Sequence, residues 1–164
     1  MEYRLAKTED VERIFELICD AIKEMESRGI FQWDAIYPTR EDFYEDIEDE
    51  ALYIAYEEDA IVAIYVISAK SDEAYQNATW KYPDETAYIL HRFCVAPGYQ
   101  NQGMGKKILT NIEEQVRSMG YESVRLDVFT GNPFALKLYD KSGYETRGYA
   151  DWRKGRFALM EKKL

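Results

Sequence analysis

The chain has few of the residues on which disulfide-bonded, metal-binding or membrane proteins depend. Its 164 residues include two cysteines and one histidine, and Cys19 and Cys94 do not form a Cys-x-x-Cys pair. Two thiols cannot make a disulfide framework, and a single histidine excludes a histidine-rich metal site. We therefore expect reduced, buried thiols, no metal cofactor and a cytoplasmic location.

Long apolar runs and an excess of basic residues are also absent. No run is long enough to span a bilayer, and the charged first ten residues lack the apolar stretch of a signal peptide. The 21 Lys and Arg residues against 31 Asp and Glu residues give a net charge of −10. This balance argues against nucleic acid and against anionic lipid as partners, since both bind basic surfaces. Neither a nucleic-acid partner nor a membrane is expected.

Hydrophobic residues make up 46% of the chain and aromatic residues 15%, enough for a substantial core. The length fits a single domain over residues 1–164. Thr8, Thr39 and Asn132 are predicted helix caps, and Gly29, Gly120 and Gly143 are predicted helix ends. Apolar periodicity predicts helices over 8–29, 40–48, 103–119 and 132–143, and strands over 2–5, 51–56, 61–68, 87–95, 123–128, 144–149 and 157–162, with a polar excursion over 71–85.

This order of elements predicts an α/β fold, with a mixed, partly antiparallel central sheet of about seven strands flanked by about four helices. The two strand-helix-strand passages late in the chain are expected to pair in parallel or diverge.

One stretch differs from the acidic background. No Asp or Glu occurs from Thr86 to Ile112, although an even distribution would place about five there. The stretch instead contains Arg92, Lys106 and Lys107. Within it, the segment Gln100-Asn101-Gln102-Gly103-Met104-Gly105-Lys106 joins a predicted strand to a predicted helix.

The chemistry of this junction favours an anion. The first N–H groups of a helix have no internal partner, and glycines allow a ligand to approach the backbone. The alternative is a tight turn that requires glycine, followed by two solvated lysines. The spacing matches neither the dinucleotide-binding fingerprint nor the phosphate loop of nucleotide hydrolases.

A second group of residues lies downstream. Asn132, Ala135 and Tyr139 fall at intervals of three and four, on one face of the predicted short helix. Asn132 has the structural role of helix cap, and Tyr139 is either a core aromatic or a general acid. A phenol suits the protonation of a departing thiolate, because thiols have pKa values near 8.5 and phenols near 10.

Together, the two groups resemble the GNAT family of N-acetyltransferases. Gln-x-x-Gly-x-Gly at 100–105, after a strand ending Phe93-Cys94-Val95-Ala96-Pro97, resembles the family's acyl-coenzyme A signature. Asn-x-x-Ala-x-x-Leu-Tyr at 132–139, followed by Ser142-Gly143-Tyr144, resembles its second motif. The order of elements is similar over essentially the whole chain. The resemblance implies an enzyme that moves an acetyl group from acetyl-CoA to a primary amine by direct attack.

The resemblance also implies roles for individual residues. The strands over 87–95 and 123–128 would splay apart to admit the pantetheine arm. Main-chain groups of Phe93 and Val95 would bind the arm and polarise the thioester carbonyl. Asn132 would bind the arm, Tyr139 would protonate the thiolate, and Cys94 would be a packed thiol rather than a nucleophile. The residues implied to contact acetyl-CoA are Phe93, Cys94, Val95, Gln100, Asn101, Gln102, Gly103, Met104, Gly105, Lys106, Asn132 and Tyr139.

The base and the acceptor site are left open. Glu85 and His91 are the first candidates for the general base, with Tyr88 and a water chain as alternatives. Trp33, Tyr37 and Trp80 either bind the acceptor or pack the helix junction and the loop. The acceptor is expected to be a small-molecule or peptide amine, and the resemblance is compatible with a homodimer. Two other readings stay open: a non-catalytic acyl-CoA-binding or sensing module on the same fold, and a phosphate-binding regulatory domain for another nucleotide.

Overall fold

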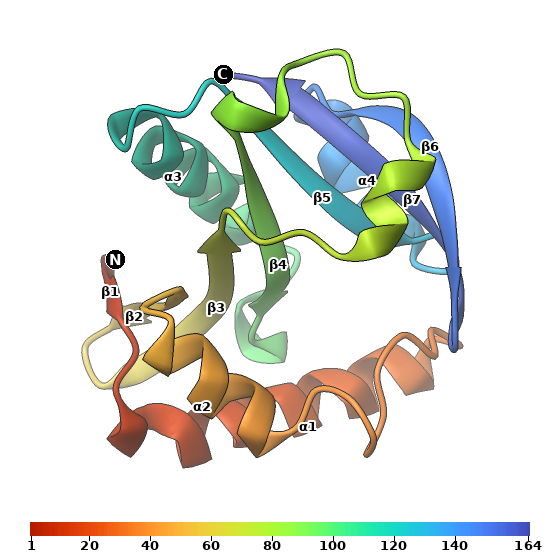
Figure 1. Cartoon of the computed structure of the whole chain (residues 1–164). Helices are drawn as coiled ribbons and strands as arrows, with labels where there is room; N and C mark the ends of the chain where they lie inside the picture. Colours follow the sequence, from red (N-terminus) through yellow and green to blue (C-terminus); the bar gives the residue numbers. More distant parts are fainter. The chain divides into compact units, whose positions relative to one another are not determined.

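Seven β-strands and four α-helices follow one another along the computed structural model, which describes all 164 residues (Figure 1). Four short 3-10 helices, η1 to η4, lie between them. The main elements are β1 (Glu2–Leu5), α1 (Val11–Ser27), α2 (Arg40–Glu48), β2 (Leu52–Glu57), β3 (Ala60–Ser68), β4 (Ala87–Val95), α3 (Met104–Ser118), β5 (Ser123–Phe129), α4 (Pro133–Lys141), β6 (Glu145–Trp152) and β7 (Gly155–Lys163).

The elements form two compact units. Residues 1–67 and 92–104 make the N-terminal unit, and residues 68–91 and 105–164 make the C-terminal unit. Strand β4 contributes its first part to the C-terminal unit and its last part to the N-terminal unit. Single-domain organisation over 1–164 stays a prediction.

In the N-terminal unit, an antiparallel sheet is covered by α1 and α2. Strands β1, β2 and β3 pair in that order, and the Ala96 N–H donates to the Val62 carbonyl at 2.8 Å, beside the end of β4. The apolar face of α1, with Ile14 and Ile18 fully buried, packs in one cluster with Phe43 of α2 and with residues of β2 and β3. Burial of this apolar surface is the main force that holds the two helices on the sheet.

Of the two helix caps predicted in the N-terminal unit, one is confirmed and one is wrong. Thr39 caps α2 as predicted, because its hydroxyl accepts the Asp42 N–H at 3.3 Å. The prediction that Thr8 caps α1 is wrong, since Thr8–Asp10 form the 3-10 helix η1. There the Asp10 carboxylate accepts the Lys7 N–H at 2.7 Å and pairs with the Arg4 guanidinium at 2.8 Å. A charged acceptor with two donors replaces the weaker hydroxyl cap.

In the C-terminal unit, α3 carries the chain from β4 to the parallel strand β5, and β7 then lies antiparallel between β5 and β6. Figure 1 shows α4 behind β5 and β7, and the η2 segment in front of them. The hydrogen-bonded strand order is β1-β2-β3-β4-β5-β7-β6. The predicted mixed α/β fold with a seven-stranded, partly antiparallel sheet and four helices is therefore confirmed.

The excursion predicted between β3 and β4 is a packed part of the C-terminal unit. It contains η2 (Glu73–Asn77) and η3 (Asp84–Thr86). The Tyr75 hydroxyl, buried with its ring, donates to Asp127 of β5 at 2.7 Å. A Cβ added at Gly148 of β6 would lie 2.7 Å from the Ala78 Cα, so the excursion's backbone passes where a side chain would be. This close approach requires glycine at position 148.

No helix of the structure has the length and apolar composition needed to cross a membrane. The structure also contains no group of three or more His, Cys, Asp or Glu side chains placed to hold a metal ion.

Candidate active site

The predicted site residues divide between the two units. The N-terminal unit contains the end of β4, the turn that follows it, Trp33 and Tyr37. The C-terminal unit contains Glu85, His91, Trp80, the body of α3 and all of α4.

The end of β4 is fixed by the turn that follows it. The Gln100 side chain folds back and donates from Nε2 to the Val95 carbonyl at 2.9 Å. Phe93 and Val95 are half-buried, whereas Cys94 between them is buried among the apolar residues of α1, β2 and β3. Phe93 and Val95, the two residues implied to contact the thioester, are thus both partly accessible to solvent, whereas Cys94 lies in the core.

The turn itself presents an exposed stretch of backbone. After η4 (Pro97–Tyr99), Asn101 and Gly103 have left-handed φ angles of +60° and +73°. Residues 101–103 are exposed, and a Cβ added at Gly103 would meet no heavy atom within 4 Å. The N–H groups of residues 101–104 have no main-chain acceptor. These donors, at the positive end of α3 and in a sequence stretch without carboxylates, fit a phosphate group.

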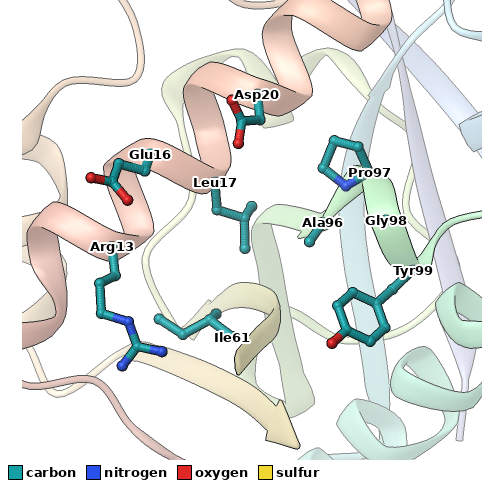
Figure 2. Close-up of a pocket in the computed structure, with 9 residues that line it drawn as sticks. All are labelled: Arg13, Glu16, Leu17, Asp20, Ile61, Ala96, Pro97, Gly98 and Tyr99. Atoms are coloured by element: carbon teal, nitrogen blue, oxygen red, sulfur yellow. The ribbon is translucent and has the colours of Figure 1, made fainter. Parts of the chain in front are cut away.

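The 3-10 helix η4, directly before this turn, and α1 line a pocket of about 410 Å³ (Figure 2). Glu16 and Asp20 of α1 lie on one side of it, Tyr99 lies on the other, and Leu17 and Ile61 lie between them (Figure 2). Two carboxylates make this pocket unsuitable for a phosphate chain. The exposed glycine side of the turn is therefore the better anion site.

In the C-terminal unit, the first turn of α3 lies against α4. A Cβ added at Gly105 would be 3.5 Å from a methyl carbon of Leu138. Asn132 caps α4 as predicted, accepting the Ala135 N–H at 3.1 Å. Lys106 is exposed, while Asn132 and Tyr139 are 9% and 7% exposed. The structure thus brings the predicted cofactor residues of α3 next to the helix that carries the predicted acid.

The Tyr139 ring packs edge-on against Tyr144, with 5.5 Å between the ring centroids. The Tyr144 hydroxyl donates to Glu113 of α3 at 2.9 Å, and the Lys162 ammonium of β7 pairs with the same carboxylate. Burial, and then the Glu113 charge, raise the pKa of Tyr144 well above its usual value. Tyr144 is therefore a neutral support for Tyr139, tied to α3 and β7.

The two first candidates for the base have different surroundings. Glu85 is exposed in η3. The Nε2 atom of His91 lies 3.0 Å from the Lys70 carbonyl oxygen. A carbonyl only accepts, so the neutral His91 ring has its proton on Nε2. Tyr88, the third candidate, packs on Tyr121 with 4.2 Å between centroids.

Of the three predicted acceptor residues, only Tyr37 is exposed. Trp33 lies in the core of the N-terminal unit at 8% exposure. In the C-terminal unit, Trp80 is half-buried, donating to the Tyr75 carbonyl at 2.9 Å and covered by Arg125. Tyr37 is 37% exposed, and its hydroxyl accepts from Arg92 at 2.6 Å.

Sequence reasoning did not assign a role to Arg92 or to its partner Asp46. The Arg92 guanidinium donates to both Asp46 carboxylate oxygens, from Nε at 2.9 Å and from Nη2 at 2.5 Å. One signal was present in the sequence, because Arg92 is the one charged residue in an otherwise largely apolar strand.

We expect Cys94 to be unreactive toward thiol reagents. Burial raises the pKa of its thiol to about 12, so almost no thiolate exists at about pH 8. Iodoacetamide should modify only Cys19 in the folded protein and both thiols in urea, as measured by intact mass. A Cys19→Ser variant should stay unmodified when folded. Rapid modification of Cys94 in that folded variant would contradict the buried position.

Comparison with known proteins identifies relatives of one kind. The "Acetyltransferase (GNAT) family" profile matches residues 12–144. The chain is 26% identical to S-(2-succino)cysteine N-acetyltransferase of Bacillus subtilis over 98% of this chain and 94% of that protein. It is 24% identical to S-alkylcysteine N-acetyltransferase of the same organism, over 87% of this chain and 78% of that protein.

Solved structures show the same fold. A GNAT-family acetyltransferase from Streptococcus agalactiae superposes with a TM-score of 0.87 at 21% identity, covering 99% of this chain and 95% of that one. The PaiA N-acetyltransferase from Thermoplasma acidophilum, solved in complex with coenzyme A, superposes with a TM-score of 0.72 at 19% identity, covering 99% and 98%.

Proposed function

The chain belongs to the acetyltransferase (GNAT) family, to which residues 12–144 match, and on this premise we propose that it transfers the acetyl group of acetyl-CoA to a primary amine. The observation that carries the proposal is the exposed, carboxylate-free turn at 100–106, which leads into α3 beside α4. Related folds hold coenzyme A, as in PaiA of Thermoplasma acidophilum.

The turn after β4 is the proposed binding site for the pyrophosphate. The N–H groups of Gln102 to Lys106 lie at the positive end of α3, where a phosphate is favoured. Lys106 adds a flexible positive charge. Gln100 acts indirectly, because its hydrogen bond to the Val95 carbonyl holds the turn against β4. This binding is shared by ground and transition states, so it lowers KM rather than raising kcat.

The chemical step is proposed to be direct. The amine lone pair attacks the thioester carbon, and the carbon–sulfur bond then breaks with both electrons going to sulfur. Main-chain groups at Phe93 and Val95 polarise the carbonyl and stabilise the negative charge on its oxygen. Tyr139 donates its phenolic proton to the departing thiolate. Cys94 takes no part, because its thiol is buried and protonated.

Before it attacks, the acceptor's ammonium must lose a proton. Glu85 and His91 both stay candidates for this base. Their surroundings differ, because Glu85 is exposed in η3, while the Nε2 atom of His91 lies 3.0 Å from the Lys70 carbonyl oxygen. Single Glu85→Gln and His91→Gln variants, compared by their pH profiles of kcat/KM, assign the role.

Release of free coenzyme A from acetyl-CoA across a panel of amines tests the function. The panel should contain α-amino acids, S-(2-succino)cysteine, S-alkylcysteines, polyamines and a short peptide with a free N-terminus. At least one amine should give release well above hydrolysis without amine, with the acetylated product visible by mass. Coenzyme A binding without turnover of any amine would contradict the proposal and indicate a sensing module.

A further inference from the structure

Arg92 occupies an unusual backbone position for a charged, half-buried residue. Its φ angle is +46°, inside a strand and at a residue that is not glycine. Such a conformation is strained and persists only where the surroundings impose it. It aims the side chain at α2 and at the segment between α1 and α2.

Some of the N–H donors of the Arg92 guanidinium have hydrogen-bond partners, and others have none. Asp46 of α2 occupies Nε–H and one N–H of Nη2, and Tyr37 accepts one N–H of Nη1. A guanidinium has five N–H donors, so one on each terminal nitrogen has no partner. The Arg92 side chain is 17% exposed. An N–H donor of a guanidinium forms a charge-assisted hydrogen bond with a carboxylate oxygen.

Stability alone explains this cluster poorly. Asp46 is buried to 11% side-chain exposure, and burial raises its pKa even with Arg92 beside it. Buried ion pairs gain little over apolar residues of the same size. What the pair does achieve is rigidity, since Asp46 on one edge and Tyr37 on another hold the fork in a single orientation.

The cluster includes exposed apolar surface. Tyr37, which bonds to Arg92, is 37% exposed, and Ile36, its neighbour in the sequence, is 68% exposed. The segment is held in place by Asp34, whose carboxylate accepts the N–H groups of Ile36 and Tyr37 at 3.0 and 3.3 Å. A carboxylate-binding fork beside an apolar, aromatic surface fits a ligand with a carboxylate and an apolar side chain.

Resting on the proposed function, we propose that Arg92 binds the carboxylate of an α-amino acid acceptor and so determines acceptor specificity. In an α-amino acid the amine and the carboxylate are bonded to one carbon, so a fixed carboxylate also fixes the amine. Arg92 directly precedes Phe93, whose main chain is proposed to polarise the thioester. Asp34 holds the exposed apolar surface of Ile36 and Tyr37 in place for the side chain.

Acceptors that differ only in the carboxylate test this on the unaltered enzyme. The pairs are S-methylcysteine with S-methylcysteinamide, and the best amino acid of the panel with its amide. We expect kcat/KM for the acid to exceed that for the amide by about 10- to 100-fold, mostly through KM. The amide has the less basic amine and so more free base, which alone would favour the amide.

The Arg92→Lys variant keeps a cation for Asp46 but loses the planar fork. We expect its preference for acid over amide to fall to about 3-fold or less, with the affinity for coenzyme A unchanged. Arg4→Lys is the matched control, because Arg4 also donates to both carboxylate oxygens of a partner, Asp10, in the same unit. It should keep the full preference. If Arg92→Lys fails to fold, the Arg92→Leu/Asp46→Leu double variant removes both charges together.

Three outcomes would overturn the assignment. They are equal rates for acid and amide in the wild type, an unchanged preference in Arg92→Lys, and a best acceptor that has no carboxylate. Calorimetric titration of the same acids and amides into the coenzyme A-bound protein compares their dissociation constants without turnover. If no amine is acetylated, the proposed function fails. If acids then still bind more tightly than amides through Arg92, the carboxylate-binding site stands without the role in acceptor specificity.

Discussion

Replacing Gly103 by glutamate is expected to weaken coenzyme A binding by at least about 100-fold while the protein stays folded. The side chain has room, since a Cβ at Gly103 meets nothing within 4 Å and the residue is exposed. The new carboxylate would lie at the start of α3, among the N–H groups proposed to bind pyrophosphate. Repulsion between charges about 4 Å apart near a protein surface reaches about 4 kcal/mol. A carboxylate at a helix N-terminus favours the free protein, so it also competes with the ligand.

Two matched variants separate charge from backbone strain. Gly103→Ala introduces only the cost of a side chain at φ +73°, and we expect at most about a 10-fold loss of affinity. Gly120→Glu places the same residue after the other end of α3, where φ is +94° and no atom lies within 4 Å. It should bind coenzyme A like the wild type.

Calorimetric titration and thermal melting with coenzyme A and with ATP provide the measurement. Coenzyme A should stabilise the wild type and Gly120→Glu, and ATP should stabilise neither to the same extent. Near wild-type affinity of Gly103→Glu for coenzyme A would show that the pyrophosphate binds elsewhere. Stabilisation by ATP but not by coenzyme A would instead favour a regulatory domain for another nucleotide.

The parts of the fold that the sequence predicts well are those that depend on local chemistry. Thr39 and Asn132 cap their helices through bonds to residues three positions later. Gly29 ends α1 with φ +76°, and the Ile30 N–H bonds back to the Met25 carbonyl. Such ends are visible in the sequence because both partners lie within one turn. Thr8 fails for the opposite reason, since Arg4 of β1 helps to make Asp10 the better acceptor.

The turn proposed to bind phosphate, residues 100–106, and the cluster of Arg92, Asp46 and Tyr37 differ in the same way. Residues 100–106 are contiguous, so their glycines and missing carboxylates indicate an anion site directly. Arg92, Asp46 and Tyr37 come from three separate segments, and only the folded chain brings them together. Trp80 is similar, because its place over Arg125 depends on how the excursion packs against β5. The sequence identifies such residues as candidates for the acceptor site, but it does not distinguish a residue that packs in the structure from one that binds a ligand.

Removing a single hydroxyl, in Tyr139→Phe, is expected to lower kcat about 100-fold and to change coenzyme A affinity less than about 2-fold. Phenylalanine keeps the ring and its edge-on contact with Tyr144, so α4 keeps its position. The variant lacks the proposed proton donor for the departing thiolate. Water must then supply it, or the thiolate must leave unprotonated. Single-turnover and steady-state rates, with the dissociation constant from calorimetry, separate this effect from binding.

Tyr144→Phe is the control, because it removes a hydroxyl from the other ring of the same contact. Tyr144 donates to Glu113, which still has Lys162 after the change. We expect a loss of about 1–2 kcal/mol in the free energy of unfolding and a kcat close to that of the wild type. A lower free energy of unfolding in Tyr144→Phe and a lower kcat in Tyr139→Phe would show that Tyr144 has a structural role and Tyr139 a catalytic one. Equal kcat in Tyr139→Phe and the wild type would instead make Tyr139 a packing residue, and the proton would have to come from solvent.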